Sequence, residues 1–497
     1  MRATVAHALA CSLFLASSAL AQIRVVALPS KSPLVDFRIV FLTGAAYDPP
    51  EKPGLASLTA SQITGGGTRE LTYKQFVDTM FPMAATVSSQ VDKEMITFYG
   101  STDIHNLEKY YALLRGILLT PGWREADLRR VKDRQINFLR VSLRESNEEE
   151  LAKEVLYQTI YAGRPYGHQN TGTVSALQAM TMGDVRRFYE SQFTQTNVVI
   201  GIGGGYPEGF PDRMKKDFEA LPALPKGAPT PRSIPQPRSA GSPQALLIEK
   251  QTRSVAISLG TPLDVKRGDP DFLPLLVAQS YLGQHRVSGG RLFDRMRDLR
   301  GLNYGDYAYI EYFPRGMFRF EPEPNLARQQ QIFQIWIRPV PPEAAHFALR
   351  LALFELDKMI RDGLTPEAFE RTRSFLVKNV NLLIKTKQAE LGYAIDSLFY
   401  GIPDYNSYVR NGLAKLTVKE VNDAIGRRLR TDDIRIVAVA QNCEELKRRL
   451  AGNLFSPMKY NSDKPEAVLA EDEIVERWRI ALKPESIQIV PVASLFE

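Results

Sequence analysis

The segment "RMRDLRGLNYG", residues 295–305, holds two side chains whose types and spacing suit peptide chemistry. Arg297 places a guanidinium on a predicted helix. Tyr304, seven residues later, places a phenol at the start of the following strand. Together they can donate hydrogen bonds to a peptide carbonyl, or to an oxyanion formed from it. Taken alone, the pair is better explained as part of a basic helix surface, with Arg295 and Arg300, and of an aromatic strand.

Serines form a second candidate in "GLASLTASQITGGGT", residues 54–68. Ser57 and Ser61 are one helical turn apart and therefore lie on one face of a predicted helix. A serine nucleophile needs a base beside it, and no histidine is close in the sequence. The two serines are therefore better explained as small residues that allow close helix packing.

Two glycine-rich segments are not nucleotide sites. The glycines at 65–67 follow a predicted helix and lack the Lys-Ser/Thr ending of a phosphate loop, so they predict a helix C-terminus. The segment "GIGGG", residues 201–205, lacks both the spacing and the following acid of a dinucleotide-binding turn.

Histidines give no clustered metal site in the sequence. Beyond the N-terminal leader they are His105, His168, His285 and His346, and no two lie within a helical turn or a hairpin of each other. His168 lies in a predicted loop, where a turn or packing role explains it better than metal ligation.

The elements that must position these residues occur twice. The segment "MTMGDVRRFYESQFTQTNVVIGIGG" from Met180 aligns without a gap on "LTVKEVNDAIGRRLRTDDIRIVAVA" from Leu416. In each copy a threonine, Thr181 or Thr417, caps an amphipathic helix and a β-branched strand follows. Upstream, "WREADLRRVK" corresponds to "LTPEAFERTR", both with acids in the first turn of a helix. We therefore expect a duplicated domain.

Each copy begins with apolar strands, at residues 36–47 and 254–263, before its helices. This order predicts an α+β fold in which helices pack on an antiparallel sheet. Seven prolines in residues 221–245 predict an extended linker between the copies. The predicted domains are 22–221 and 246–453, joined by a Pro-rich linker at 222–245, with a C-terminal extension at 454–497 that has no counterpart in the first copy.

The N-terminus predicts export. "MRATVAHALACSLFLASSALAQ" has one arginine, an apolar run and small residues before Gln22, which is typical of a signal peptide cleaved after Ala21. The leader is too short and wrongly flanked for a membrane span. Cys11 belongs to the apolar run, and only Cys443 remains after cleavage, so no disulfide forms within the mature chain. We expect a periplasmic protein.

The formal net charge of +7 does not indicate nucleic-acid binding. Basic runs such as "RRLR" and "KRRL" alternate with acids on helix-like segments, as on a solvated surface. No RNA- or DNA-binding motif accompanies them.

The ordered landmarks resemble those of the M16 (pitrilysin/insulinase-like) metallopeptidases, in particular the small two-domain members. They are "GAAYDPPEKPGLA" at 44–56, the closing "GGGT", "TPGW" at 120–123, "AGRPYGHQNTGT" from Ala162 and "GGRLFDRMRDLRGLNYGDYA" at 289–308. The resemblance covers nearly all of residues 23–453. It implies two M16-type domains that face each other as a clamshell.

Active members of this family carry H-x-x-E-H on the helix after the first landmark. Two histidines bind zinc, the glutamate acts as general base, and a glutamate downstream completes the metal ligands. The resemblance places these positions at Ser57, Ala60, Ser61 and Leu139. A serine hydroxyl is a poor zinc ligand, and an alanine methyl cannot abstract a proton. The chain is thus expected to bind no zinc or other cofactor and to have no catalytic residue of its own.

The resemblance also assigns a role to Arg297 and Tyr304. In the family an arginine and a tyrosine of the C-terminal domain hold the substrate, and two-subunit members divide these groups from the zinc site between chains. The leading hypothesis is an exported, non-catalytic subunit that binds peptide through Arg297 and Tyr304. Its expected partner is a separate H-x-x-E-H subunit, in a heterodimer that carries the zinc, so that peptidase activity belongs only to the complex.

Two alternatives remain open. The chain is a structural or peptide-binding scaffold with no peptidase role, or it is a divergent zinc endopeptidase with an unrecognised site. The presence of a neighbouring gene for a similar chain with the intact histidine motif distinguishes the subunit from the scaffold. Metal analysis and a broad peptide screen test the divergent enzyme.

Overall fold

The computed structural model describes residues 23–223, 234–237, 239 and 241–497. The predicted signal peptide and half of the predicted linker lie outside these residues. The second domain begins slightly earlier than predicted, because Gln244 and Ala245 already belong to its first strand. No helix in the described part of the chain is both long and apolar enough to cross a bilayer.

Two sheets form the framework. The first contains β1 (Arg24–Pro29), β2 (Leu34–Phe41), β3 (Ser88–Val91), β4 (Ile96–Asp103) and β5 (Val198–Gly204). The second contains β6 (Gln244–Glu249), β7 (Val255–Leu263), β8 (Asp306–Tyr309), β9 (Gln331–Val340), β10 (Arg435–Ala440) and β11 (Ile487–Pro491).

The two sheets have the same topology, which confirms the α+β fold with two homologous domains. The strand order is β1-β5-β2-β4-β3 in the first sheet and β6-β10-β7-β9-β8 in the second, where β11 is added beside β6. The sheets are not wholly antiparallel as predicted, because β1 pairs with β5, and β6 with β10, in parallel. A parallel pair needs a long crossover, and most of the helices of each half lie between its two paired strands.

Helices follow the strands in the same order in both halves. In the first half they are α1 (Leu55–Gly65), α2 (Tyr73–Met80), α3 (Leu107–Leu119), α4 (Glu125–Asn137), the π-helix η4 (Phe138–Glu145), α5 (Glu148–Ile160), α6 (Val174–Ala179), α7 (Met182–Gln192) and α8 (Phe210–Phe218). In the second they are α9 (Phe272–Gly283), the π-helix η5 (Phe293–Asp298), α10 (Ala345–Asp362), α11 (Pro366–Leu383), α12 (Lys387–Tyr400), α13 (Tyr405–Lys415), α14 (Val418–Arg428), α15 (Cys443–Ala451) and α16 (Glu466–Val475).

The predicted helix starts are confirmed. Thr181 caps α7 and Thr417 caps α14, each in a capping box whose third helical residue, Asp184 or Glu420, bonds back to the cap. The apolar strand predicted at 36–47 is shorter, because the chain leaves the sheet after Phe41 and makes a short 3-10 turn.

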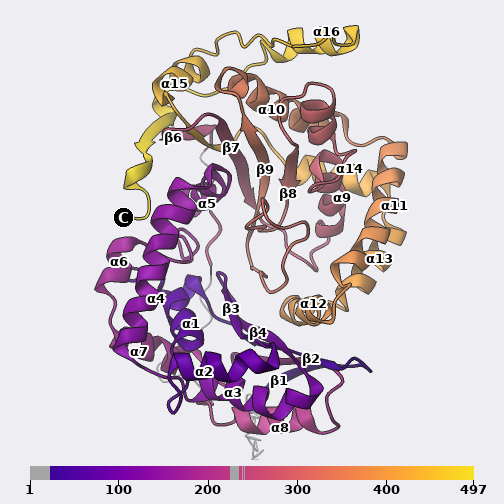
Figure 1. Cartoon of the computed structure of the whole chain (residues 1–497). Helices are drawn as coiled ribbons and strands as arrows, with labels where there is room; N and C mark the ends of the chain where they lie inside the picture. Colours follow the sequence, from indigo (N-terminus) through magenta and orange to yellow (C-terminus); the bar gives the residue numbers. More distant parts are fainter. Residues whose placement is uncertain (1–22, 224–233, 238, 240) are drawn as a thin grey trace, which may run out of the picture.

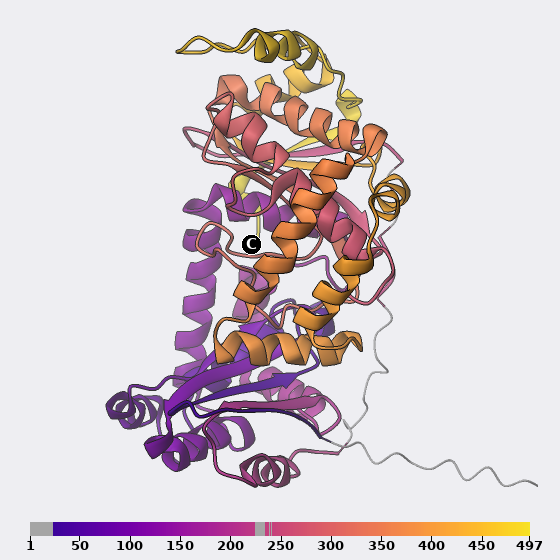
Figure 2. The same ribbon diagram turned by 90° about the vertical axis from the view of Figure 1, so that its right-hand side faces the viewer.

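Each half lends one helix to the sheet of the other half. Helix α5 of the first half packs on β7, β9 and β10, and α12 of the second half packs on β1, β2 and β5 (Figure 1). Figure 2 shows α12 lying across the strands of the first sheet. The second face of each sheet is therefore covered, and β5 and β10 are buried along their whole length.

The exchange explains two of the glycines at 201–205, Gly201 and Gly203. A Cβ on Gly201 would lie 2.9 Å from Ile395 Cδ1 and 3.2 Å from Leu391 Cδ1, and a Cβ on Gly203 would lie 2.7 Å from Lys387 Cγ. These glycines lower the surface of β5 so that α12 can approach, which is a packing role and not a nucleotide-binding one.

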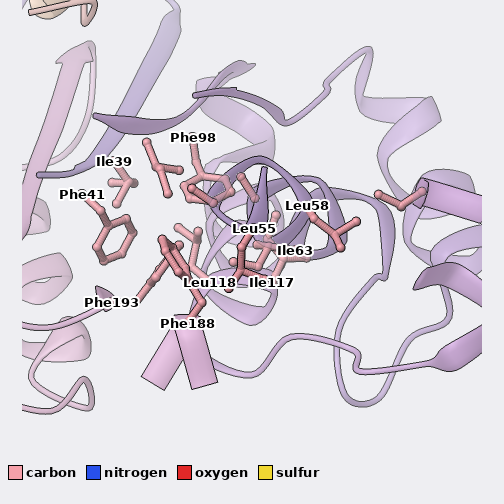
Figure 3. Close-up of a cluster of buried hydrophobic side chains, with 14 of the residues drawn as sticks. Ile39, Phe41, Leu55, Leu58, Ile63, Phe98, Ile117, Leu118, Phe188 and Phe193 are labelled. Carbon is pink, nitrogen blue, oxygen red and sulfur yellow. The ribbon is translucent and has the colours of Figure 1, made fainter. Parts of the chain in front are cut away.

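Helix α1, which carries the two serines, is set firmly in the core. Figure 3 shows Leu55, Leu58 and Ile63 of this helix among aromatic side chains that include Phe98 of β4 and Phe193. The three aliphatic residues are at most 3% exposed. The opposite face of α1 is left for smaller polar residues.

The C-terminal extension, 454–497, joins the two halves. Its strand β11 extends the second sheet, and its last residues reach the first half, where Val174 N donates to Phe496 O at 2.7 Å. Glu497 accepts from Arg144 at 2.6 Å and from Arg140 at 2.9 Å. The extension therefore belongs to the fold of both halves.

The close approach of α12 gives a stability prediction. Gly201→Val should lower the free energy of unfolding by about 2 kcal/mol, because the new side chain overpacks the contact with Ile395 and Leu391. Urea unfolding followed by circular dichroism measures the change.

Gly426→Ala in α14 is the matched control. No atom lies within 4 Å of a Cβ placed at Gly426, so alanine should raise stability by up to about 1 kcal/mol. A Gly201→Val protein as stable as the unmodified chain would contradict the packing described for α12.

Candidate functional site

Ser57, Ala60 and Ser61 lie on α1 as predicted, and the two serines face a cavity. Ala60 is fully buried. The N-terminus of the helix is held by Asp48, whose carboxylate accepts from Gly54 N and Ala56 N, each at 2.7 Å. A carboxylate at this end also complements the helix dipole. The frame of the helix is thus rigid although its polar face carries only hydroxyls.

His168 supports this frame. Its Nε2 lies 3.1 Å from Asp48 Oδ2, behind the helix N-terminus. Burial, together with the charge of Lys93, lowers the pKa of His168, so the imidazole is neutral at pH 7. This geometry agrees with the packing role predicted for it.

Gln135 fills the space in front of the serines. From α4, its Nε2 donates to Ser57 Oγ at 3.2 Å and to Ser61 Oγ at 3.0 Å, and the residue is only 7% exposed. The structure brings Gln135 to the serines rather than Leu139, which lies one turn further on, in η4, buried in the apolar core.

Sequence reasoning missed Gln135, although one signal for it was present. The buried stripe of α4 runs Leu128, Val131, Gln135, so an amide occupies a position where the helical period demands an apolar residue. A polar residue on a buried stripe needs a partner, and the two serines provide it.

The serines open into a cavity of about 520 Å³ between the two halves, here called the central cavity. Edge strand β3 forms part of its wall through Ser89, Gln90 and Val91. From the second half the wall includes Tyr312, Pro314, Arg315, Phe318 and Leu326. All five belong to the β8–β9 connection, residues 310–330, which Figure 1 shows descending toward the first half.

The acids on the wall of the central cavity already have partners. Glu154 accepts from Tyr312 Oη at 2.6 Å, and Glu150 accepts from Arg315 N at 2.9 Å and lies 3.4 Å from Lys153 Nζ. Burial raises the pKa of Glu154. These contacts join α5 to the β8–β9 connection.

A buried ion pair fixes the same connection to the first sheet. Arg328 Nε donates to Asp92 Oδ2 at 2.7 Å, and its guanidinium lies 3.6 Å from the centre of the Tyr312 ring. Next to this pair, Gln329 N donates to Glu94 at 2.7 Å, and burial raises the pKa of Glu94 to about 7. The central cavity therefore has a wall held by paired charges.

Arg297 and Tyr304 lie apart from the serines. Tyr304 is 78% exposed, and the Arg297 side chain is 44% exposed with its guanidinium 4.7 Å from the centre of the Phe293 ring. Neither residue lines the central cavity. The turn that carries Tyr304 is closed by Gly301 and Gly305, both with positive φ, which glycine adopts without strain.

Two family models match the chain. The one described as Insulinase (Peptidase family M16) covers residues 24–174, and the one described as Peptidase M16 inactive domain covers residues 179–376. This chain belongs to the M16 peptidase family.

The curated proteins that are similar to this chain include one named as a non-peptidase. The Helicobacter pylori "Non-peptidase homolog YmxG" is 22% identical over 82% of this chain and 89% of its own length. The Streptomyces coelicolor "Uncharacterized zinc protease SCO5738" is 24% identical over 64% of this chain and 63% of its own length. This chain is thus similar both to proteins described as zinc proteases and to one described as a non-peptidase.

Solved structures share the fold. A peptidase M16 inactive domain from Pseudomonas fluorescens superposes with a TM-score of 0.72, at 21% identity, over 85% of this chain and 96% of that one. The periplasmic protease PqqL from Escherichia coli gives a TM-score of 0.65, at 13% identity, over 92% of this chain and 49% of that one.

The residues of this M16 chain do not fit the family's zinc ion. Zinc sites in proteins use thiolates, imidazoles and carboxylates, whereas this site presents the hydroxyls of Ser57 and Ser61 and the amide of Gln135. Among the described residues, no three His, Cys, Asp or Glu side chains are grouped so that they could hold a metal. The chain is an M16 homologue without the family's zinc ligands on α1, and no catalytic step is assigned to it.

The position of Gln135 gives a prediction by reconstruction. A variant with Ser57→His, Ser61→His and Gln135→Glu should bind one zinc ion, because the three side chains converge in the present structure. The double histidine variant that keeps Gln135 is the control and should bind zinc about 100-fold more weakly, a difference of about 2.7 kcal/mol. Titration against a zinc chelator measures both constants.

The same assay tests the alternative position. A variant with the two histidines and Leu139→Glu should gain nothing over the double histidine control, because Leu139 lies in the apolar core. Zinc binding as tight as that of the Gln135→Glu variant would contradict the placement of Gln135.

Proposed function

We propose that this chain is an exported, non-catalytic M16 subunit that holds an extended polypeptide in the central cavity and acts with a separate M16 chain that carries the zinc. The observation that carries the proposal is the contrast at α1. Gln135 donates to the two serines that stand at the expected histidine positions, while the cavity of about 520 Å³ that Ser57 and Ser61 line stays open. A site without metal that keeps its cavity is suited to binding rather than to cleavage.

The edge of the first sheet supports polypeptide binding. Strand β3 pairs only with β4 among the described strands, and Ser89, Gln90 and Val91 line the central cavity. An extended chain can add to such an edge through main-chain hydrogen bonds, with little demand on its sequence. The polar wall formed by α5 and the β8–β9 connection limits how far that chain reaches.

A partner and an exported location complete the proposal. In two-subunit members of the family one chain holds the zinc and the other supplies an arginine and a tyrosine, and this chain keeps Arg297 and Tyr304 at exposed positions. The N-terminal leader directs it to the periplasm. One structural neighbour is itself described as a periplasmic protease.

Peptide binding by the isolated chain is the first test. A fluorescent, unstructured peptide should bind, as measured by anisotropy. Two further peptides are then compared, one N-methylated at its odd-numbered amides and the other at its even-numbered amides. One of them should bind about tenfold or more weakly and the other nearly as well as the unmodified peptide, because a strand added to β3 directs only alternate amides toward it. Equal weakening of both peptides would contradict strand addition.

Activity of the complex is the second test. The purified chain alone should contain no zinc and cleave no peptide, and addition of an H-x-x-E-H partner from the same envelope should give cleavage. Arg297→Ala and Tyr304→Phe should reduce kcat/KM about tenfold, since each removes a charged or hydroxyl hydrogen bond to the substrate. Arg430→Ala, at an exposed arginine outside the central cavity, is the control.

The outcome also separates the alternative role. If the chain binds another envelope assembly equally well with and without Arg297 and Tyr304, and no partner gives cleavage, it is a scaffold. Stoichiometric zinc in the isolated chain would instead identify a divergent enzyme.

A further inference from the structure

A second cavity, of about 250 Å³, lies within the second half. Helices α9, α11, α12 and α13 and the β8–β9 connection form its wall. The aromatic residues on that wall are Tyr309, Tyr312, Phe313, Phe320, Tyr393 and Tyr405. We call it the aromatic cavity. Among the described residues, Tyr312 alone lines both this cavity and the central cavity.

The strongest charge on this wall is compensated within the protein. Arg267 donates to the two carboxylate oxygens of Glu311 at 2.9 and 3.1 Å, and its Nη1 lies 3.7 Å from Asp396. Its guanidinium also stacks at 4.3 Å from the centre of the Tyr405 ring. Because these carboxylates compensate its charge, Arg267 attracts an anionic ligand only weakly.

The remaining titratable groups of the wall are neutral or bonded within the protein. His285 Nδ1 lies 2.8 Å from Tyr309 Oη, its Nε2 lies 2.8 Å from Arg319 O, and burial lowers the pKa of His285 to about 3. Glu321 accepts from a lysine of the segment before α12, at 2.8 Å. Arg286 donates to the carbonyl of Met317 at 2.5 Å, and its guanidinium lies 4.8 Å from the centre of the Phe320 ring. A charged ligand would lose its hydration here, and the countercharge of Arg286 is already engaged with a carbonyl and an aromatic ring.

Four buried polar atoms of wall residues lack a hydrogen-bond partner in the described structure: Tyr393 Oη, Gln284 Oε1, Arg267 Nη1 and Arg286 Nε. An unpaired buried hydroxyl or amide costs free energy that a ligand with one polar group can recover. Tyr393 and Gln284 are the neutral groups among these four.

The two halves differ at the segment that closes this cavity. The connection between β3 and β4 is a tight turn at 92–95, whereas the equivalent β8–β9 connection spans 310–330. Its ends are fixed by the Arg328–Asp92 ion pair and by Lys153 Nζ, which donates to Phe313 O at 2.6 Å. Between them Phe320 lines the cavity yet is 72% exposed, so it lies at the border with solvent.

From these features we infer that the aromatic cavity binds a small neutral ligand, with an aromatic body and one polar group, entering past Phe320. Cavities of this kind, mostly apolar with a few placed polar groups, are typical of small-molecule sites. This site is independent of peptide binding and of any partner chain. It lies entirely within the second half.

A pair of matched probes tests the inference. N-phenyl-1-naphthylamine is neutral, and 8-anilinonaphthalene-1-sulfonate has the same ring system with an added sulfonate. The mature full-length chain, without peptide or partner, should enhance the fluorescence of the neutral probe and bind it at least about tenfold more tightly than the sulfonate. Equal affinity for the two probes, or no binding of the neutral one, would overturn the inference.

Variants locate the binding. Val380→Trp, on the α11 face that lines the cavity, should weaken binding of the neutral probe about tenfold or more by filling the space. Val377→Trp, on the same helix but outside the lining, is the matched control. An unchanged affinity in Val380→Trp would place the probe elsewhere and overturn the assignment.

A second variant keeps the test valid if Val380→Trp does not fold, which circular dichroism shows. Phe320→Ala removes a side chain that is mostly in solvent and should leave the fold intact. It should weaken the neutral probe about threefold or more, because one aromatic wall is lost. No change in a folded Phe320→Ala protein would exclude the entry past Phe320.

Discussion

The exchange of α5 and α12 between the two halves is the constraint on which the rest of the structure depends. A sheet covered on one face only would leave β5 or β10 open to water, and the helix that closes each of them belongs to the other half. The contact is not apolar alone. Glu149 of α5 pairs with Arg338 at 3.2 Å, and Arg38 of β2 donates to Gln388 O of α12 at 3.0 Å. Removal of one partner of such a contact would leave a buried charge unpaired, which costs several kcal/mol.

This constraint also creates the central cavity. Because α5 crosses to the second sheet, its acids meet the β8–β9 connection, and Tyr312 and Arg315 of that connection reach Glu154 and Glu150. The space between α1, β3 and the connection is then bounded by charged and hydrogen-bonded contacts where α5 meets the connection. A change of metal ligands on α1 leaves this frame in place, since the frame is held by other residues. The M16 fold therefore does not depend on metal ligands on α1.

The degenerate site shows how a polar position can be made neutral without collapse. The amide nitrogen of Gln135 donates to both serines, where the family resemblance expects two imidazoles and a carboxylate in a metal-binding chain. The replacements are smaller and uncharged, so no buried charge is left without a counterion. Asp48 and His168 still hold the N-terminus of α1, which keeps the serines directed at the cavity.

Much of the fold could be predicted from the sequence, because the signals are local. Thr181 and Thr417 mark helix starts by their own side chains, and the aligned segments around them indicate a duplicated α+β domain. The absence of histidine and glutamate at Ser57, Ala60 and Ser61 could also be predicted, because the family's landmarks place the metal-binding motif at these positions. The parallel strand pairs and the helix exchange could not, since they depend on contacts between residues far apart in the chain.

What the sequence by itself determined is therefore the family, the duplicated domain and the absence of zinc ligands on α1. Only the tertiary structure decided that Gln135 rather than Leu139 meets the serines, that Arg297 and Tyr304 lie outside the central cavity, and that the glycines of β5 serve α12. The physical reason is the distance along the chain over which each kind of interaction acts. Capping and periodicity act within a few residues, whereas a side chain's partner is chosen by packing that brings distant segments within hydrogen-bond distance.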